Sequence, residues 1–213
     1  MCILIIKLHI KRINFALTST EIKISKNLEN GIEFTCQMCG NCCRGFDEGE
    51  VYLYKEDILR LAKFLNIKGA NALKNFAKKY AKIINDSFFW KEPGAQRGKT
   101  YRFKTLGFRF TGKNEHCHFL KDNICSVHEA RPFQCRSFPF WQMMVSSRKN
   151  FEGYTKKCKG LQVLKGKSYT KEEILNWAKK EYEIEKKFFL EMKQNKFNIL
   201  KVYPFLSKEM LEE

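Results

Sequence analysis

A dense cysteine cluster is the feature that most constrains this chain. The stretch FTCQMCGNCCR, residues 34–44, places four of the nine cysteines within eight residues, at Cys36, Cys39, Cys42 and Cys43. Disulfides, a metal or iron–sulfur centre, or a redox-active dithiol bring that many thiols together. A C-x-x-C spacing lets two thiolates from one tight turn reach the same ion, and Gly40 after the second cysteine lets the backbone curl. The spacing therefore favours a ligand-bearing loop.

Length and composition argue against disulfides as the reason for the cluster. The chain has 213 residues, of which 44% are hydrophobic, and this is enough to bury one ordinary core without covalent bridges. We expect no membrane span, because no run reaches the roughly 18 apolar residues that a span needs. The short apolar run near the N-terminus precedes its charges, which is the wrong order for a secretory signal. We therefore expect a cytoplasmic protein, where thiols stay reduced and such clusters are more often metal sites.

A second cysteine group lies in the C-terminal half of the chain. It holds four cysteines, whereas Cys2 stands apart at a terminus. Four proximal and four distal thiols are the right number for two four-coordinate centres. We predict that one or two metal centres are held by Cys36, Cys39, Cys42, Cys43, Cys117, Cys125, Cys135 and Cys158.

The spacing does not identify the metal. The steps from Cys36 to Cys39 to Cys42 match the first three ligands of a bacterial ferredoxin run, but position 46 is Phe46, so both this run and the radical-SAM signature are incomplete. Thiolates suit an iron–sulfur cluster and zinc equally well. Cys43 directly follows Cys42, and neighbouring side chains diverge, so the pair either faces two centres or bridges two metals. Three histidines flank the distal cysteines and are further candidate ligands or surface residues: His116, His118 and His128.

Both cysteine blocks resemble the YkgJ-type cysteine cluster family. The likeness rests on the C-x-x-C-G-x-C-C pattern at residues 36–43 and, after Cys117 and Cys125, on the block RPFQCRSFP at residues 131–139. It covers about residues 32–160. The resemblance implies a zinc- or iron-chelating protein and says little about a reaction. Similar cysteine-rich stretches occur in flagellin lysine methylases, which leaves a role related to protein methylation as a lesser alternative.

Basic and rigid residues accompany the predicted ligands. Arg44, Arg131 and Arg136 lie next to ligand cysteines or close to them in sequence, where a guanidinium offsets the negative charge of a thiolate centre or donates hydrogen bonds to sulfur. Surface exposure is the alternative for each. Pro132 and Pro139 stiffen the distal loop, which helps a loop to hold ligands without a helix or strand.

Hydrophobic periodicity predicts a mixture of helices and short strands. Strands are expected within residues 3–10 and 21–35. A brief strand followed by a helix is expected over residues 51–67, with a second helix over residues 70–85 joined to the first around Gly69. Alternating aromatic residues around Gly107 predict strands or a hairpin with a bulge. A capping box formed by Thr170 and Glu173 begins a long amphipathic helix that runs to about Asn195.

These elements predict an α+β fold: a small, cysteine-rich, metal-centred domain with packed helices and short strands. We divide the chain into a strand-like extension at residues 1–31, a cysteine cluster domain at residues 32–160 and a helical segment at residues 161–213.

The net charge of +17 suggests nucleic acid at first, but the lysines are spread along the whole chain, and this favours a solvated basic surface. We find no nucleophile–base pair, phosphate-binding glycine loop or paired carboxylates, so whether the chain is an enzyme stays open. The preferred function is an iron–sulfur protein in electron transfer or an oxidoreductase step, with a protein or redox partner. The alternatives are a zinc-stabilised binding module and a metal-chelating protein without catalysis.

Overall fold

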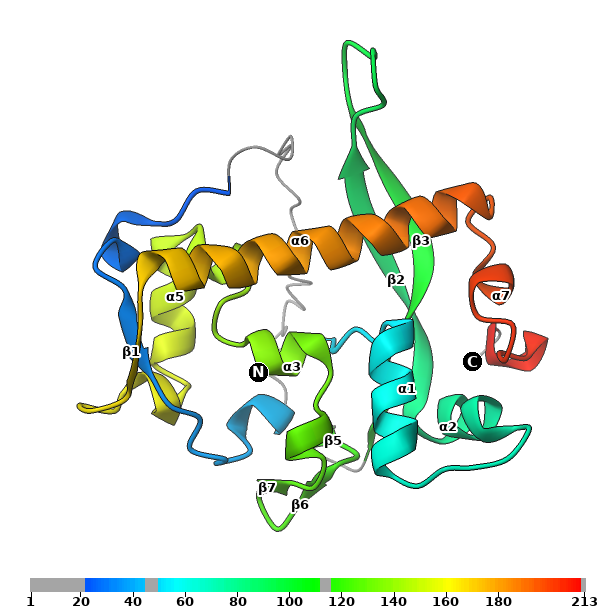
Figure 1. Cartoon of the computed structure of the whole chain (residues 1–213), viewed down its shortest axis with the longest axis horizontal. Coiled ribbons are helices and arrows are strands. Elements are labelled where there is room, and N and C mark those ends of the chain that lie inside the picture. Colours follow the sequence, from blue (N-terminus) through cyan, green and yellow to red (C-terminus); the bar gives the residue numbers. More distant parts are fainter. Residues whose placement is uncertain (1–21, 45–49, 112–115, 212–213) are drawn as a thin grey trace, which may run out of the picture.

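The computed structural model describes residues 22–44, 50–111 and 116–211, and these form the predicted α+β fold. Figure 1 shows the long helix α6 running across the molecule, with the β2–β3 hairpin crossing it near one end. The helices are α1 (Lys55–Phe64), α2 (Ala72–Tyr80), α3 (Phe133–Ser137), α4 (Gln142–Val145), α5 (Arg148–Thr155), α6 (Lys171–Gln194) and α7 (Ile199–Val202). The strands are β1 (Ile32–Phe34), β2 (Ala81–Trp90), β3 (Lys99–Phe108), β4 (Phe110–Thr111), β5 (His116–Cys117), β6 (Leu120–Lys121), β7 (Ile124–Cys125) and β8 (Lys167–Tyr169).

The strands within the described residues pair as four antiparallel ribbons and not as one sheet. β1 pairs with β8, β2 with β3, β4 with β5, and β6 with β7. An isolated two-stranded ribbon is marginally stable at best, so each ribbon depends on packing against other parts of the chain.

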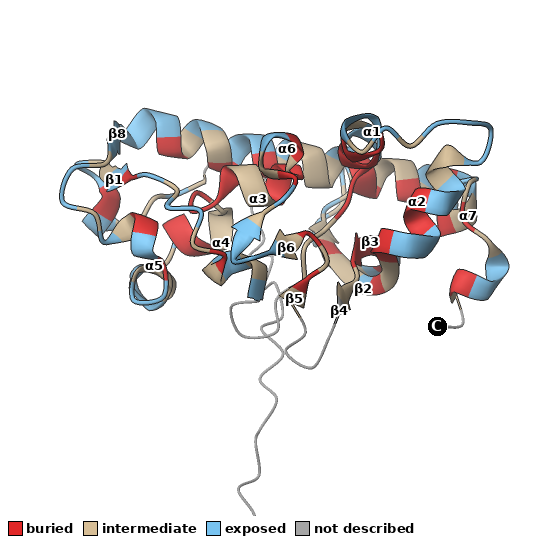
Figure 2. Cartoon of the chain, turned by 90° about the horizontal axis from the view of Figure 1, so that it is seen from below, coloured by how far each residue is buried: buried red, intermediate tan, exposed pale blue. Residues whose placement is uncertain are grey.

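The buried side chains form two hydrophobic clusters rather than one. The hairpin cluster gathers β2, β3, α1, α2, α7 and the C-terminal half of α6, with Phe76, Leu106 and Phe189 fully buried. The β1 cluster gathers β1, α4, α5 and the N-terminal half of α6, with Met144 and Ile174 fully buried. Figure 2 shows buried positions along the inner sides of these elements. The molecule therefore has a seam between two apolar cores.

Helix α6 spans that seam. Its predicted capping box is confirmed, because the Thr170 side chain accepts from the Glu173 N–H and the Glu173 side chain accepts from the Thr170 N–H. The helix ends at Gln194, as predicted. Near its middle, the buried carboxylate of Glu181 accepts a hydrogen bond from the Gln142 N–H at 2.6 Å, at the start of α4. This contact satisfies an otherwise unpaired helix-terminal donor.

The predicted helix over residues 70–85 is wrong in its second half. α2 ends at Tyr80, and residues 81–90 form β2 in continuous register with β3, for example Ile84 opposite Thr105. The β-branched side chains Ile83 and Ile84 extend the helical stripe in sequence, yet they suit a pleated strand. Ten pairs of residues with β3 outweigh the local helical period.

A strand around Gly107 is confirmed, but the predicted bulge is wrong. β3 passes through Gly107, which pairs with Lys82, and the strand ends at Phe108. A Cβ atom at Gly107 would lie 2.7 Å from Ile84 Cδ1, so the glycine provides close packing and not a bulge. The predicted strand-to-helix transition over residues 51–67 is confirmed by a β-bridge at Tyr52 followed by α1.

The N-terminal predictions have mixed outcomes. The strand expected at residues 3–10 lies outside the described residues. Of the strand expected over residues 21–35, the described part begins at residue 22; within it only Ile32–Phe34 forms a strand, and Lys26–Leu28 forms a 3₁₀ helix. In the part of the chain that the structure describes, no helix has the length and apolar character to cross a membrane. The division at residues 31 and 160 stays a prediction.

Candidate metal centre

The proximal cysteines follow β1: Cys36 and Cys39 lie on a loop that turns at Gly40, and Cys42 and Cys43 lie in the short 3₁₀ helix Asn41–Arg44. Gly40 has a φ of +72°, in the left-handed region, and its carbonyl accepts from the Cys43 N–H at 3.0 Å. A Cβ atom there would lie 2.7 Å from both the Asn123 carbonyl oxygen and Leu120 Cδ1. The predicted role of Gly40 in bending the loop is thus confirmed, and the loop packs directly against the β6–β7 hairpin.

The distal cysteines lie on three short elements and one connection. Cys117 is on β5, Cys125 on β7, Cys135 on α3, and Cys158 follows α5. The β6–β7 turn at Asp122 and Asn123 has φ values of 47° and 65°, which aspartate and asparagine tolerate better than most residues.

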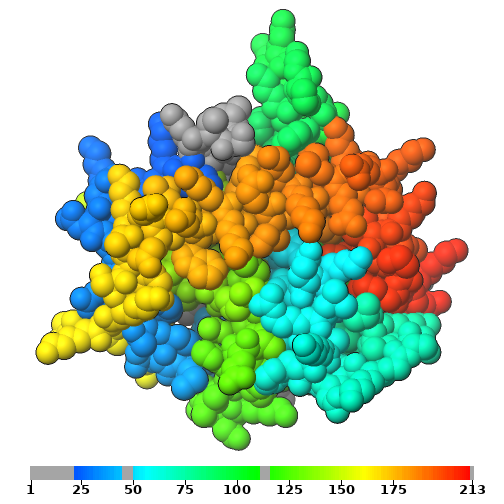
Figure 3. Space-filling model, viewed as in Figure 1, coloured from blue at the N-terminus to red at the C-terminus, as the bar shows by residue number. Residues whose placement is uncertain are grey.

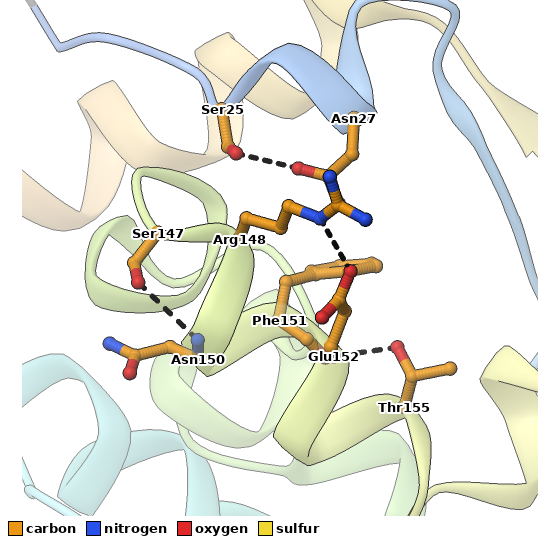
Figure 4. A network of polar contacts seen from close by, with 8 residues as sticks. All are labelled: Ser25, Asn27, Ser147, Arg148, Asn150, Phe151, Glu152 and Thr155. Carbon is orange, nitrogen blue, oxygen red and sulfur yellow. Dashed lines mark hydrogen bonds and ion pairs between the residues drawn. The ribbon is translucent and has the colours of Figure 1, made fainter.

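Helix α5 holds Cys158 in place. Its N-cap, Ser147, accepts from the Asn150 N–H at 3.3 Å, and Arg148 pairs with Glu152 at 2.6 Å (Figure 4). At the other end, the Cys158 N–H donates to the Tyr154 carbonyl at 2.9 Å.

Polar contacts attach the proximal loop to the distal segments. The Thr35 N–H donates to the Gly160 carbonyl at 3.2 Å, which brings the neighbour of Cys36 close to the Cys158 segment. The Asn41 side chain donates to the Lys157 carbonyl at 3.2 Å. The Arg44 guanidinium donates to the Asn123 side chain. Segments more than seventy residues apart in sequence therefore meet around the thiols.

Cys43 contacts one thiol from each of the two cysteine groups. Cys43 forms side-chain hydrogen bonds with Cys125 and Cys42, and these contacts raise the pKa of Cys43 so that it keeps its proton. The same contact with Cys43 lowers the pKa of Cys42 to about 7 and that of Cys125 to about 6. The positive charge of Arg131 lowers both values further. Cys43 therefore connects the proximal and distal groups.

The remaining distal thiols surround this contact. Burial, followed by the charges of neighbouring cysteines, raises the pKa of Cys117 to about 11 and raises that of Cys135 well above its usual value. The negative charges of Cys42 and Cys125 contribute to the raised pKa of both thiols. Burial also raises the pKa of Cys158, and the negative charges of Cys42 and Cys39 raise it further. Cys117 and Cys158 are buried, Cys42 is exposed, and the others are half-buried.

The thiols lie at the seam between the two hydrophobic clusters. Cys117 is part of the hairpin cluster, with Cys43 and Cys125 packed against it. Cys158 is part of the β1 cluster, with Cys36 packed against it. A centre that used both sets of sulfur atoms would tie the two cores together.

The three predicted arginines differ in what they contact. Arg131 Nη1 lies 4.0 Å from the Cys36 sulfur, and its Nε donates to the His128 carbonyl at 3.1 Å. Arg44 donates to the Cys39 carbonyl at 3.4 Å. Arg136 donates to the Arg131 carbonyl at 3.0 Å. Among the described residues, Arg131 is the one of the three that contacts a sulfur atom, as expected for a residue that balances thiolate charge.

The candidate histidines have other surroundings. His118 packs edge-on against Tyr80 with ring centroids 4.9 Å apart, and burial lowers its pKa. His116 is on β5, paired with Thr111. The Nε2 atom of His128 is buried and has no hydrogen-bond partner among the described residues.

The eight described cysteines are free thiols, which suits a soft metal or an iron–sulfur cluster. Within the described ranges, no three His, Cys, Asp or Glu side chains are already grouped tightly enough to hold one metal ion. The donor set therefore fits metal binding in its chemistry and in the pairwise contacts of Cys43 with Cys42 and Cys125, while the described side chains do not form a complete ligand shell.

Comparison with known families agrees with this chemistry. The family CxxCxxCC, described as a "putative zinc- or iron-chelating domain", matches residues 35–162. The chain belongs to this family. The matched CxxCxxCC segment begins one residue before Cys36 and ends shortly after Cys158, so it contains all eight candidate ligands. No solved structure matches the chain.

Sequence patterns missed several residues that position the CxxCxxCC thiols. Three of them make contacts that cannot be read from the cysteine spacing. Asn41 and Asn123 form side-chain hydrogen bonds, and Gly160 allows a close backbone contact. Asp57 is 2% exposed and accepts from the Phe133 N–H at 2.8 Å and the Tyr54 N–H at 3.4 Å, which ties α1 to the helix that carries Cys135. In sequence, Asp57 looks like an ordinary acidic residue in the first turn of a helix.

Proposed function

We propose that the eight cysteines hold a metal centre that joins the two hydrophobic clusters, and that this centre is an iron–sulfur cluster used in electron transfer. The observation that carries the metal centre is the contact of Cys43 with Cys42 and Cys125, which brings together thiols from both sequence groups. Metal binding would stabilise the fold, because it closes a loop of more than seventy residues between the groups.

Two features favour iron. Cys42 is exposed, so the centre would have an edge near the surface where a redox partner could approach. Arg131 lies close to the Cys36 sulfur, and hydrogen bonds and charges near the sulfur atoms set the reduction potential of such clusters. An iron–sulfur cluster supplies reversible one-electron transfer, whereas zinc has no redox chemistry.

Zinc is the second candidate, and its support is the burial of Cys117 and Cys158. These thiols are 7% and 8% exposed, each within a different hydrophobic cluster, as expected for a closed structural site. In that case the chain is a zinc-stabilised module, and its function is to bind a partner.

One preparation separates the two candidates. The protein is purified without oxygen, its visible absorption is recorded, and iron, zinc and acid-labile sulfide are assayed on the same sample. A brown protein with iron and sulfide, which bleaches on reduction, supports electron transfer. A colourless protein with stoichiometric zinc and no sulfide contradicts it and supports the structural module.

A further inference from the structure

A groove of about 950 Å³ lies between α1 and α6, with α3 at one side. Figure 3 shows α6 and α1 next to each other on one face of the molecule, with the segment of α3 beside them. This volume is at the upper end of the range for small-molecule sites, roughly 300–1,000 Å³. The groove is separate from the cysteine cluster, although α3 contributes to both.

The groove has more positive than negative charge. Six basic and four acidic side chains line it. Two of the acidic residues are already paired with lysines, Glu56 with Lys187 at 2.9 Å and Glu183 with Lys186 at 3.8 Å. A third, Asp57, is buried and hydrogen-bonded to backbone N–H groups. Most of the lining carboxylates are therefore committed to other groups.

Two guanidinium groups line the groove and form no ion pair with the described residues. Arg60 and Arg136 lie close enough to interact electrostatically with each other and with the buried Asp57. Among the described residues Arg60 makes no hydrogen bond or ion pair, and the Arg136 Nε donates to a backbone carbonyl. The exposed Lys180 lines the groove from α6. Neighbouring guanidiniums repel each other, so an anion between them is favoured, and their planar donors suit carboxylate or phosphate oxygens.

Apolar side chains make up another part of the lining. Leu59 is 47% exposed on α1, and Phe133, Ile184 and Phe188 contribute carbon surface from α3 and α6. A small inorganic ion would leave this surface in water. An organic anion with an apolar body would cover it while its head group meets the guanidiniums.

We propose that this groove binds a small amphiphilic anion, whose carboxylate or phosphate head contacts Arg60, Arg136 and Lys180 and whose apolar body covers Leu59 and Ile184. The two head groups share the same recognition chemistry. Because Arg136 directly follows Cys135, the ligand would contact the same short helix that carries a candidate metal ligand.

Calorimetric titration of the full chain, with whatever metal it carries as purified, tests the proposal. The probes are hexanoate, hexyl phosphate, inorganic phosphate and hexylammonium. We expect saturable binding of hexanoate or hexyl phosphate, with the tighter of the two identifying the head group, and no binding of hexylammonium. Arg60→Gln should weaken that binding at least tenfold, because it removes a charged donor pair. Leu59→Asn should weaken hexyl phosphate but leave inorganic phosphate unchanged.

Lys63→Gln is the matched control, because Lys63 lies on the same helix but outside the groove lining. The affinity of Lys63→Gln for the tighter-binding anion should remain within twofold of the wild-type value. Arg60→Gln should keep the wild-type melting temperature, because Arg60 forms no hydrogen bond or ion pair with the described residues. Three results would overturn the proposal. They are no saturable binding of either hexanoate or hexyl phosphate, an equal loss of affinity in Arg60→Gln and Lys63→Gln, and binding of hexylammonium as tight as that of the anions.

Discussion

Replacing Asp57 by alanine tests whether a buried carboxylate holds α3, and with it Cys135, in place. The substitution removes the acceptor for the Phe133 N–H at 2.8 Å and for the Tyr54 N–H at 3.4 Å, at a position that is 2% exposed. A hydrogen bond to a charged group contributes about 1.5–3 kcal/mol, and the longer contact to Tyr54 adds less. Burial, the largest effect, raises the pKa of Asp57, so alanine also relieves a desolvation cost.

The net effect should be a loss of about 2 kcal/mol in the free energy of unfolding. For a chain of this size that corresponds to a fall in melting temperature of roughly 4–8 °C. Bound metal should fall as well, because α3 is no longer tied to α1. Thermal unfolding followed by circular dichroism, with metal content measured on the same samples, checks both effects.

Glu56→Ala is the matched control, since Glu56 is the adjacent carboxylate on α1 and its side chain is 62% exposed in its pair with Lys187. Exposed ion pairs contribute about 0–1 kcal/mol, so this variant should melt close to the wild type. Equal melting temperatures for the two variants, or unchanged metal content in Asp57→Ala, would refute the reasoning.

The same carboxylate gives a pH dependence. Its pKa is raised in the folded state, so its contribution to stability is greatest below the unfolded value of 3.8 and is lost as pH rises through the folded pKa. The wild type should therefore gain stability relative to Asp57→Asn as pH is lowered from 7 toward 4. A constant difference in melting temperature over this range would contradict the raised pKa.

Three further predictions concern the helix that spans the seam and the thiols. Thr170→Ala removes the N-cap of α6 and should cost about 1 kcal/mol, while Thr170→Ser should melt near the wild type; equal melting curves for both would contradict the capping role. Gly40→Ala places a Cβ atom 2.7 Å from the Asn123 carbonyl at a φ of +72°, so metal content and melting temperature should both fall, whereas Gly153→Ala, with open space around its Cβ, should change neither. In the metal-free protein, alkylation of the exposed Cys42 should reach half its maximal rate near pH 7, because its pKa is lowered to about 7. Cys117, with a pKa of about 11, should stay unreactive at neutral pH. Mass spectrometry of the labelled peptides measures both rates, and equal or faster labelling of Cys117 at pH 7 would contradict these pKa values.

Local sequence signals predicted the elements that depend on nearby residues. The capping box at Thr170 and the turn of the backbone at Gly40 each follow from a few adjacent positions, and both are confirmed. The α2 prediction failed where a long-range partner decides the outcome. Residues 81–85 keep a helical stripe, but pairing with β3 makes them a strand. Periodicity within one window contains no information about that partner.

In the candidate site, too, local sequence predicted some features and long-range contacts decided others. The spacing of cysteines was enough to expect a family of metal-chelating proteins, and the family match confirms that expectation. It could not show that Cys43 and Cys125 touch, or that the thiols lie between two hydrophobic clusters. These facts depend on contacts such as Asn41 with Lys157 and Thr35 with Gly160, between residues more than one hundred positions apart.

Metal content after single cysteine substitutions tests the central claim most directly. Cys43→Ser, Cys125→Ser and Cys135→Ser are purified without oxygen beside Cys2→Ser, the control outside both cysteine groups. Bound iron or zinc per chain is then measured by plasma mass spectrometry. If thiols from both groups share the site, each of the three variants should lose much of its metal, and Cys2→Ser should keep the wild-type content. Full metal content in Cys43→Ser and Cys135→Ser would contradict a centre built from the converging thiols.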